Sequence, residues 1–126
     1  MSDFQMPQHV IDRVMEKRGR LNVFETFDPT KTAFLIVDMQ NFFVNGVQPC
    51  LNIMPNINRL AEHVRASGGL VVWVVLTVAE TEDGPSLWPI YHDNFFTEAK
   101  MKAHKAGLTR GSEGHAIHKG LDVRDE

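Results

Sequence analysis

The stretch that decides the fold is residues 33–43, which read AFLIVDMQNFF. Four apolar residues, Phe34 to Val37, lead directly into Asp38, and further polar side chains follow. A continuous apolar run bounded by polar residues is typical of a strand buried on both faces, as in the parallel sheet of an α/β domain. Ligands of open α/β sheets bind beside the carboxyl ends of the strands. Asp38 is therefore either a structural cap that binds backbone N–H groups or part of a functional site.

The composition argues against several classes of protein. The chain has 126 residues, a net charge of −3 and 43% hydrophobic residues, which indicates one globular domain. Its basic residues are dispersed, so no nucleic-acid partner is expected. The longest apolar run, residues 70–76, is too short to cross a membrane, and residues 1–10 lack a signal-peptide pattern. Cys50 is the one cysteine, which excludes an internal disulfide and favours the reducing cytoplasm.

An amphipathic helix is predicted before the strand. Pro7 suits its first turn and Gly19 its end. Its apolar side chains share one face: Val10, Ile11, Val14 and Met15. We therefore divide the chain into residues 1–23, an N-terminal helix and lead-in, and residues 24–126, a single α/β domain. The helix is expected to pack on that domain or on a neighbouring subunit.

A strand–helix–strand unit is predicted for residues 33–76. Residues 44–53 carry Gly, Pro and Asn and are expected to form an irregular loop. A helix is expected from about residue 54 to residue 66, with Pro55 in its first turn. Residues 70–76 then form a second buried strand, and the crossover makes the two strands parallel.

The rest of the chain carries fewer signals. Residues 77–95 are predicted to form a loop, and residues 97–105 a helix that Gly107 ends. Residues 107–126 show no long element. Only two strands are evident, whereas a parallel sheet usually has several strands and two covered faces. The chain is therefore predicted to be the first part of a larger α/β domain, incomplete at its C-terminus.

Several ordered segments resemble those of the isochorismatase-like hydrolases, also called the cysteine hydrolase superfamily. The first is KTAFLIVDMQNFF, residues 31–43, whose D-x-Q-N-x-F core follows an apolar strand. The others are residues 55–60, residues 68–75, and residues 111–118 with 121–124. The resemblance implies a three-layer, doubly wound α/β fold with a mainly parallel sheet.

The resemblance also implies an activity. Similar proteins cleave a C–N bond in a small amide, ureide or carbamoyl compound with a triad of aspartate, lysine and cysteine. Asp38 matches the aspartate, which acts as a general acid and base. The lysine and the cysteine match no position here, because in the family both follow a segment like residues 121–124. The 126 residues alone are therefore expected to be inactive or nearly so.

Two other functions stay open. Isochorismatase itself hydrolyses a vinyl ether with an aspartate as the acid, and some such relatives lack the cysteine, so Asp38 could act without one. A truncated, non-catalytic paralogue could instead serve as a subunit of another protein. Similar proteins are often dimers or tetramers, and a homo-oligomer with a small-molecule substrate is expected. No cofactor is expected.

Further residues are candidates for the wall of a substrate pocket. They are Gln40, Phe43, Thr77, Glu80 and Trp88. The first two follow Asp38, and Phe43 has the alternative of a core position. Thr77 and Glu80 follow the second strand. The carboxyl ends of the two predicted strands lie at the same edge of the sheet. Trp88 belongs to an aromatic stretch that is either a lid over a substrate or a subunit interface.

Neither Cys50 nor the histidines are predicted to act in catalysis or metal binding. Cys50 has no histidine adjacent in sequence and is predicted to be a small buried hydrophobe rather than a nucleophile. His115 and His118 would share a helical face, but a metal site requires three or four ligands. Nicotinamidase-like relatives carry a metal cluster after the second strand, where residues 77–82 here read TVAETE. We therefore expect no metal ion and disfavour nicotinamide as the substrate.

Overall fold

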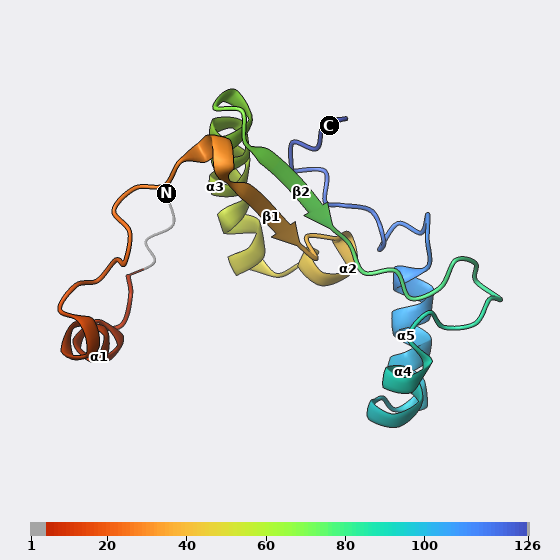
Figure 1. The fold of residues 1–126 in the computed structure, drawn as a ribbon. Coiled ribbons are helices and arrows are strands. Elements are labelled where there is room, and N and C mark those ends of the chain that lie inside the picture. The colour runs from red at the N-terminus through yellow and green to blue at the C-terminus, as the bar shows by residue number, and fades with distance from the viewer. Residues whose placement is uncertain (1–4, 126) are drawn as a thin grey trace.

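The computed structural model describes residues 5–125 and contains helices around a small sheet (Figure 1). The elements follow one another as α1 (Gln8–Arg18), a 3₁₀ turn (Pro29–Lys31), β1 (Ala33–Val37), α2 (Asn41–Val44), α3 (Gln48–Ala66), β2 (Leu70–Val74), α4 (Pro89–Phe95) and α5 (Glu98–Leu108). Helices and a parallel strand pair mark an α/β protein.

The two strands form a parallel sheet, as the strand–helix–strand prediction requires. Ala33 pairs with Leu70, and the register continues to Val37 opposite Val74. β2 ends two residues earlier than the predicted Leu76, because β1 has no further residue to pair with it. Both strands therefore end at the same edge of the sheet.

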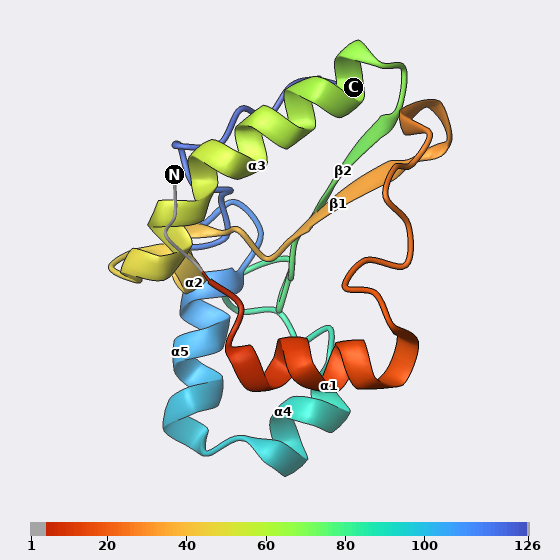
Figure 2. The ribbon, with the colours of Figure 1, turned by 90° about the vertical axis from the view of Figure 1, so that its left-hand side faces the viewer.

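Helix α3 covers one face of this sheet (Figure 2). The main core lies between them and consists of Ile36, Met39, Val44, Met54, Ala61, Val64, Val71 and Leu121. On the other face, Leu35 and Val37 are each 55% exposed. The prediction of a strand buried on both faces is thus wrong for residues 5–125: α3 covers a single face, and no described element covers the other.

Helix α3 begins earlier than predicted. It starts at Gln48, with Pro49 in its first turn, so residues 48–53 are helical rather than an irregular loop. Pro55, predicted for the first turn, lies inside the helix. A proline there removes one backbone hydrogen bond. The buried side chains of Met54, Ala61 and Val64 hold the helix on the sheet despite this loss.

The segment after β2 is more ordered than predicted. Residues 89–95, expected in a loop, form α4, because Pro89 suits a first helical turn. The helix predicted for residues 97–105 is present as α5, and the Thr97 side chain caps it. Gly107 does not end α5. It lies within the helix, and the Phe42 ring occupies the place where a side chain would be.

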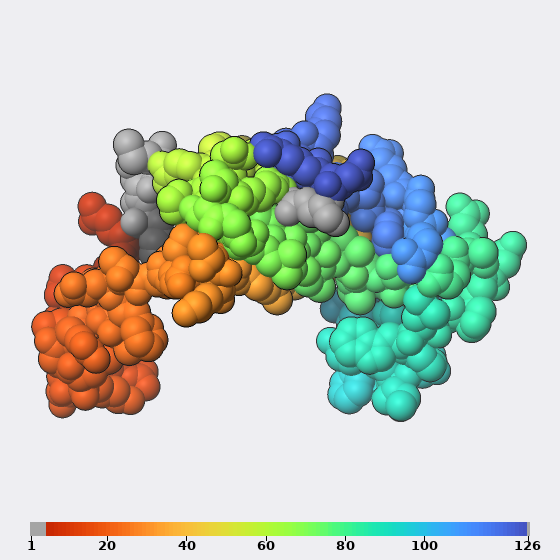
Figure 3. All heavy atoms as spheres, turned by 45° about the horizontal axis from the view of Figure 1, so that its top comes forward, coloured from red at the N-terminus to blue at the C-terminus, as the bar shows by residue number. Residues whose placement is uncertain are grey.

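Helix α1 stands apart from the rest of the chain. It ends at Gly19 as predicted, in a left-handed conformation with a φ of 67°. None of its residues is buried, so no α1 side chain enters the described core. Figure 3 shows α1 and the α4–α5 region as lobes at opposite ends of the molecule. Over residues 5–125, no helix combines the length and apolar character needed to span a bilayer.

Candidate functional site

Asp38 follows β1 directly and has an uncommon backbone conformation. Its φ is 57°, and among residues 5–125 it is the one non-glycine residue with a positive φ. This left-handed conformation costs about 1–2 kcal/mol for most residues, although Asp and Asn tolerate it better than others. Such strain persists only where the surrounding structure enforces it, and it gathers at functional sites.

The neighbours of Asp38 are firmly held. Its own N–H donates to the Val74 carbonyl at 2.9 Å, which continues the β1–β2 ladder. The Met39 carbonyl accepts the His118 N–H at 3.0 Å, and Gln40 forms an antiparallel bridge with Ile117. These bonds fix the chain on both sides of Asp38 and so enforce its conformation.

The Asp38 carboxylate is not a structural cap. It is half-buried, and no described residue forms a hydrogen bond or an ion pair with it. The Asp38 and Asn41 N–H groups beside it donate to the carbonyls of Val74 and Ala116 instead. Of the two interpretations of Asp38 offered by the sequence, the structural cap therefore has no hydrogen bond among the described residues to support it.

Gln40 acts as a clamp between three segments. It is fully buried. Its Oε1 accepts the Leu76 N–H at 2.8 Å, and its Nε2 donates to the Leu76 carbonyl at 3.0 Å and to the His115 carbonyl at 2.8 Å. Both amide hydrogens are thus engaged by backbone. The geometry gives Gln40 a positioning role in place of the predicted contact with a substrate.

Thr77 meets a histidine from the far end of the chain. Its Oγ1 lies 2.8 Å from His115 Nε2, and both residues are half-buried. Because Gln40 binds the His115 carbonyl, residues 40, 77 and 115 form one connected group beside the strand ends. His115 lies in a turn and His118 in an irregular segment after the bridge residue Ile117, so the two do not share a helical face. No group of His, Cys, Asp and Glu suited to a metal ion occurs in the part of the chain that the structure describes.

Glu80 forms an ion pair with Arg110. Both of its carboxylate oxygens accept hydrogen bonds from Arg110, from Nη2 at 3.0 Å and from Nε at 2.5 Å. These bonds hold the pKa of the Glu80 carboxyl below its ordinary value and raise that of Arg110. The pair is exposed, and the adjacent bridge between Ala79 and Thr109 aligns its two segments.

The two aromatic candidates lie in different places. Phe43 packs against the main core and meets the Phe42 ring edge-on, with 5.1 Å between centroids. Trp88 is 51% exposed and stacks on Tyr91 at 4.5 Å. Trp88 precedes α4, which lies away from the sheet in Figures 1 and 2. The structure thus brings Gln40 and Thr77 together and leaves Trp88 apart.

A buried serine–histidine pair was not predicted from the sequence. His92 is 2% exposed, and its Nδ1 lies 2.5 Å from Ser86 Oγ. The pair borders a cavity of about 520 Å³ between the loop before α4 and helix α5. No sequence signal marks it, because Ser86 precedes α4 and His92 lies within it, in a stretch (residues 77–95) that was predicted to be a loop.

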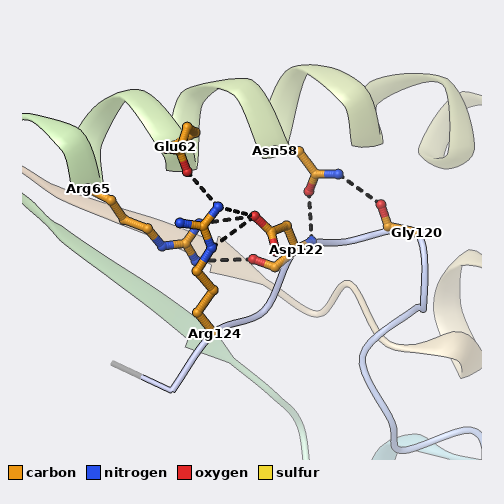
Figure 4. Close-up of polar contacts among 6 residues, drawn as sticks. All are labelled: Asn58, Glu62, Arg65, Gly120, Asp122 and Arg124. Atoms are coloured by element: carbon orange, nitrogen blue, oxygen red, sulfur yellow. Dashed lines mark hydrogen bonds and ion pairs between the residues drawn. The ribbon is translucent and has the colours of Figure 1, made fainter.

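Residues 120–124 are bound along α3 (Figure 4). Asn58 Nδ2 donates to the Gly120 carbonyl at 2.9 Å, and its Oδ1 accepts the Asp122 N–H at 3.0 Å. The Asn58 amide therefore takes the place of a neighbouring strand for this segment. The same segment buries Leu121 in the main core.

Charged groups complete this attachment (Figure 4). Arg124 Nη2 lies 2.6 Å from a carboxylate oxygen of Glu62 and 2.6 Å from one of Asp122. Arg65 Nη2 donates to the Asp122 carbonyl at 3.1 Å. The hydrogen bonds from Arg124 lower the pKa of the Asp122 carboxyl, and its charge and that of Arg65 act in the same direction.

Comparison with known protein families identifies one match. A family model described as the isochorismatase domain matches residues 32–126, from the residue before β1 to the last residue of the sequence. The match includes Asp38, both strands and the segment bound along α3. Searches of curated proteins and of solved structures gave no match. The family model covers well over half of the sequence, and the chain therefore belongs to the isochorismatase family.

Proposed function

We propose that the protein is a hydrolase that cleaves a C–N bond of a small amide, ureide or carbamoyl compound, with Asp38 as its general acid and base. The observation that carries this proposal is the Asp38 carboxylate. It stands at the carboxyl end of β1 in a left-handed conformation, and no described residue bonds to it. A half-buried acid without a structural partner at a strand end fits a catalytic role.

In this proposal Asp38 moves protons for a cysteine nucleophile. Its carboxylate accepts the thiol proton, and it later donates that proton to the leaving amine. A neighbouring lysine favours the ionised carboxylate and the thiolate. Neither partner has a matching position in the 126 residues. We assign both to residues outside this sequence.

Cys50 does not supply the missing thiol. It lies in the first turn of α3, half-buried, where it packs against the main core. No described residue pairs with its sulfur. A cysteine that packs in this way acts as a small hydrophobe, so the proposal gives it no part in the reaction.

Ether hydrolysis by Asp38 alone is the second candidate. It is favoured by the same unpaired carboxylate together with the lack of a matching cysteine in residues 1–126. A protonated Asp38 would donate its proton to the terminal vinyl carbon, water would add to the oxocarbenium carbon, and the hemiketal would break its C–O bond to give a ketone and an alcohol. A non-catalytic subunit is the outcome if neither reaction occurs.

The test compares two proteins: the complete product of the natural reading frame and residues 1–126 alone. Each is incubated with a panel of small amides, ureides and carbamoyl compounds, and ammonia release is measured. A panel of vinyl ethers is run in parallel. The proposal predicts ammonia release by the complete product and little or none by residues 1–126. Ether cleavage by residues 1–126, abolished in Asp38→Asn, would favour the second candidate instead.

A further inference from the structure

The cavity between the loop before α4 and helix α5 is separate from the strand ends. Figure 1 shows both helices beyond the ends of the two strands. The cavity is lined by none of the residues discussed at the strand ends, which are Asp38, Gln40, Thr77 and His115. Its volume of about 520 Å³ falls within the range of about 300–1,000 Å³ that is usual for small-molecule pockets. The cavity is therefore large enough for a ligand of its own.

Most of the cavity wall is apolar. Its lining includes Val78 and Pro85 from the chain after β2, Pro89 from the start of α4 and Met101 from α5. Apolar walls favour a ligand with an apolar body, because the burial of apolar surface contributes about 25 cal/mol per Å².

The serine–histidine pair interrupts this apolar wall. His92 is almost fully buried, and its Nδ1 lies 2.5 Å from Ser86 Oγ. The same Oγ accepts the Trp88 N–H at 3.0 Å. No described residue bonds to His92 Nε2. Because Ser86 and His92 both line the cavity, a ligand in it meets their polar atoms.

The pair has one hydrogen atom to spare. A neutral imidazole carries one N–H and a serine carries one O–H, and only one of these hydrogens fits between His92 Nδ1 and Ser86 Oγ. If the serine donates to Nδ1, the free hydrogen is on Nε2. If Nδ1 donates to the serine, the O–H is free. The pair therefore has one donor for a ligand in either tautomer, which favours a ligand with an acceptor such as a carbonyl oxygen.

The charged groups that line the cavity balance one another. Lys102 and Lys105 of α5 stand against Asp93 of α4 and Glu98 of α5, and none of the four forms an ion pair among the described residues. With two charges of each sign in the lining, an anion or a cation gains no net attraction, while its transfer into apolar surroundings is costly. An uncharged ligand avoids this cost. Two further acids border the lysines in a neighbouring pocket and do not line the cavity: Glu82 and Asp83.

We propose that this cavity binds a small, uncharged molecule with an apolar body and a carbonyl-type oxygen, which accepts the spare hydrogen of the Ser86–His92 pair. The apolar wall binds the body of the ligand, and the pair orients it. The site does not include Asp38, so the proposal stands whether or not the proposed reaction occurs.

Acetophenone, an uncharged aromatic ketone, is the probe for this site. It is titrated into the isotope-labelled complete product of the natural reading frame, and the backbone amide signals are followed by NMR. Saturable shifts are expected at Gly84, Ser86 and His92, with a dissociation constant of about 1 mM for a ligand of this size. Gly68, in the turn between α3 and β2, is the internal control and should not shift. No saturable shift at the cavity residues would overturn the proposal.

Charged relatives of the probe test the inferred lack of charge. Benzoate, benzylammonium and phenylalanine carry the same ring with a negative charge, a positive charge and both charges. Each should bind at least about tenfold more weakly than acetophenone. Tighter binding of any of the three at the cavity residues would contradict an uncharged ligand.

Two variants test the cavity and the pair separately. Met101→Trp fills the cavity and should weaken acetophenone binding about tenfold or more, whereas Ala99→Trp, exposed on the same helix and outside the lining, should bind like the parent. Ser86→Ala with His92→Phe removes both hydrogens of the pair. The affinity for acetophenone relative to ethylbenzene, which lacks the acceptor, should then fall about tenfold. An unchanged ratio, or equal effects of the two tryptophan variants, would overturn the proposal.

Discussion

The side-chain amide of Gln40 pairs with the backbone of Leu76 through two hydrogen bonds, of 2.8 Å from the Leu76 N–H and 3.0 Å to its carbonyl. An amide side chain thus imitates one residue of a neighbouring strand where the β1–β2 ladder has ended. The same side chain binds the His115 carbonyl, so the chain beyond β2 and the turn near the C-terminus are tied to the residues that follow Asp38.

Replacement of Gln40 by Ala should destabilise the protein strongly. It leaves three backbone groups without their partner in a fully buried place. A buried unsatisfied group costs about 1–3 kcal/mol, so a total loss of about 3–4 kcal/mol is expected after partial rearrangement. Urea unfolding measures it. Asn41→Ala, which removes one exposed bond to Glu113, is the control and should cost about 1 kcal/mol or less. Similar losses of stability in Gln40→Ala and Asn41→Ala would contradict the positioning role of Gln40.

The backbone of Asp38 should show its strain in substitutions. Asp38→Gly removes the side chain that opposes a φ of 57°, whereas Asp38→Ala keeps a Cβ without the tolerance of Asp. The glycine variant is therefore expected to be more stable than the alanine variant by about 1 kcal/mol. Thermal unfolding of both, with Asn41→Gly and Asn41→Ala as the reference pair in a helix, checks the sign. The reference pair should show the opposite order.

The attachment of residues 120–124 should weaken in acid. Because Arg124 holds the pKa of Asp122 below the ordinary 3.8, the unfolded chain binds the proton more readily than the folded one. The stability from this carboxylate is therefore present above pH 3.8 and is lost as the pH falls through the lowered value. Asp122→Asn should lower the midpoint of thermal unfolding at neutral pH, and the difference from the parent should shrink as the pH falls below 3.8. Asp125→Asn should have no such effect.

His104 should make the free energy of unfolding depend on pH closer to neutrality than Asp122 does. Burial lowers the pKa of His104 below its ordinary 6.5, and the charges of His92 and Lys100 act in the same direction. Its ring packs on Phe96 at 4.6 Å, and its Nδ1 is buried without a hydrogen bond among the described residues. A lowered histidine pKa means that protonation favours the unfolded chain, so stability present above pH 6.5 is lost on acidification.

The measurement for His104 is thermal unfolding at about pH 7.5 and about pH 5.5, on either side of the ordinary histidine value. The parent should lose stability at the lower pH, and His104→Leu should lose less. His63→Leu, an exposed histidine on α3, is the matched control and should behave like the parent. An unchanged pH dependence in His104→Leu would show that another group is responsible.

Local patterns predicted the central unit of the fold well. The apolar runs at residues 34–37 and 70–76 are reliable signals, because an apolar run of this length favours a strand without regard to the residues that flank it. Helix boundaries were less accurate. Pro55 was placed in a first turn, where proline is favoured, but tertiary packing of α3 tolerates it inside the helix. Gly107 was expected to end α5, but it provides space for the Phe42 ring, a contact 65 positions apart in the sequence that no local pattern reveals.

The candidate site was predictable only in part. Asp38 follows a strand, and its position could be inferred from the sequence alone. The role of Gln40 could not, because its partners Leu76 and His115 are 36 and 75 positions away. Thr77 was correctly placed at the shared strand edge, but its contact with His115 depends on the path of the chain beyond α5. Side-chain patterns report which face is buried and do not report which distant backbone groups lie there.

The central claim is that Asp38 carries the proton transfers of a family hydrolase. The measurement that tests it most directly is kcat/KM of the complete protein and of its Asp38→Asn variant, on the substrate found in the panel of C–N compounds. Asn has the size of Asp and the same tolerance of a positive φ, but its amide cannot take up or release a proton as a carboxyl group does. A loss of about 10²-fold to 10⁴-fold, with unchanged stability, is predicted. Equal values for the two proteins would contradict the account.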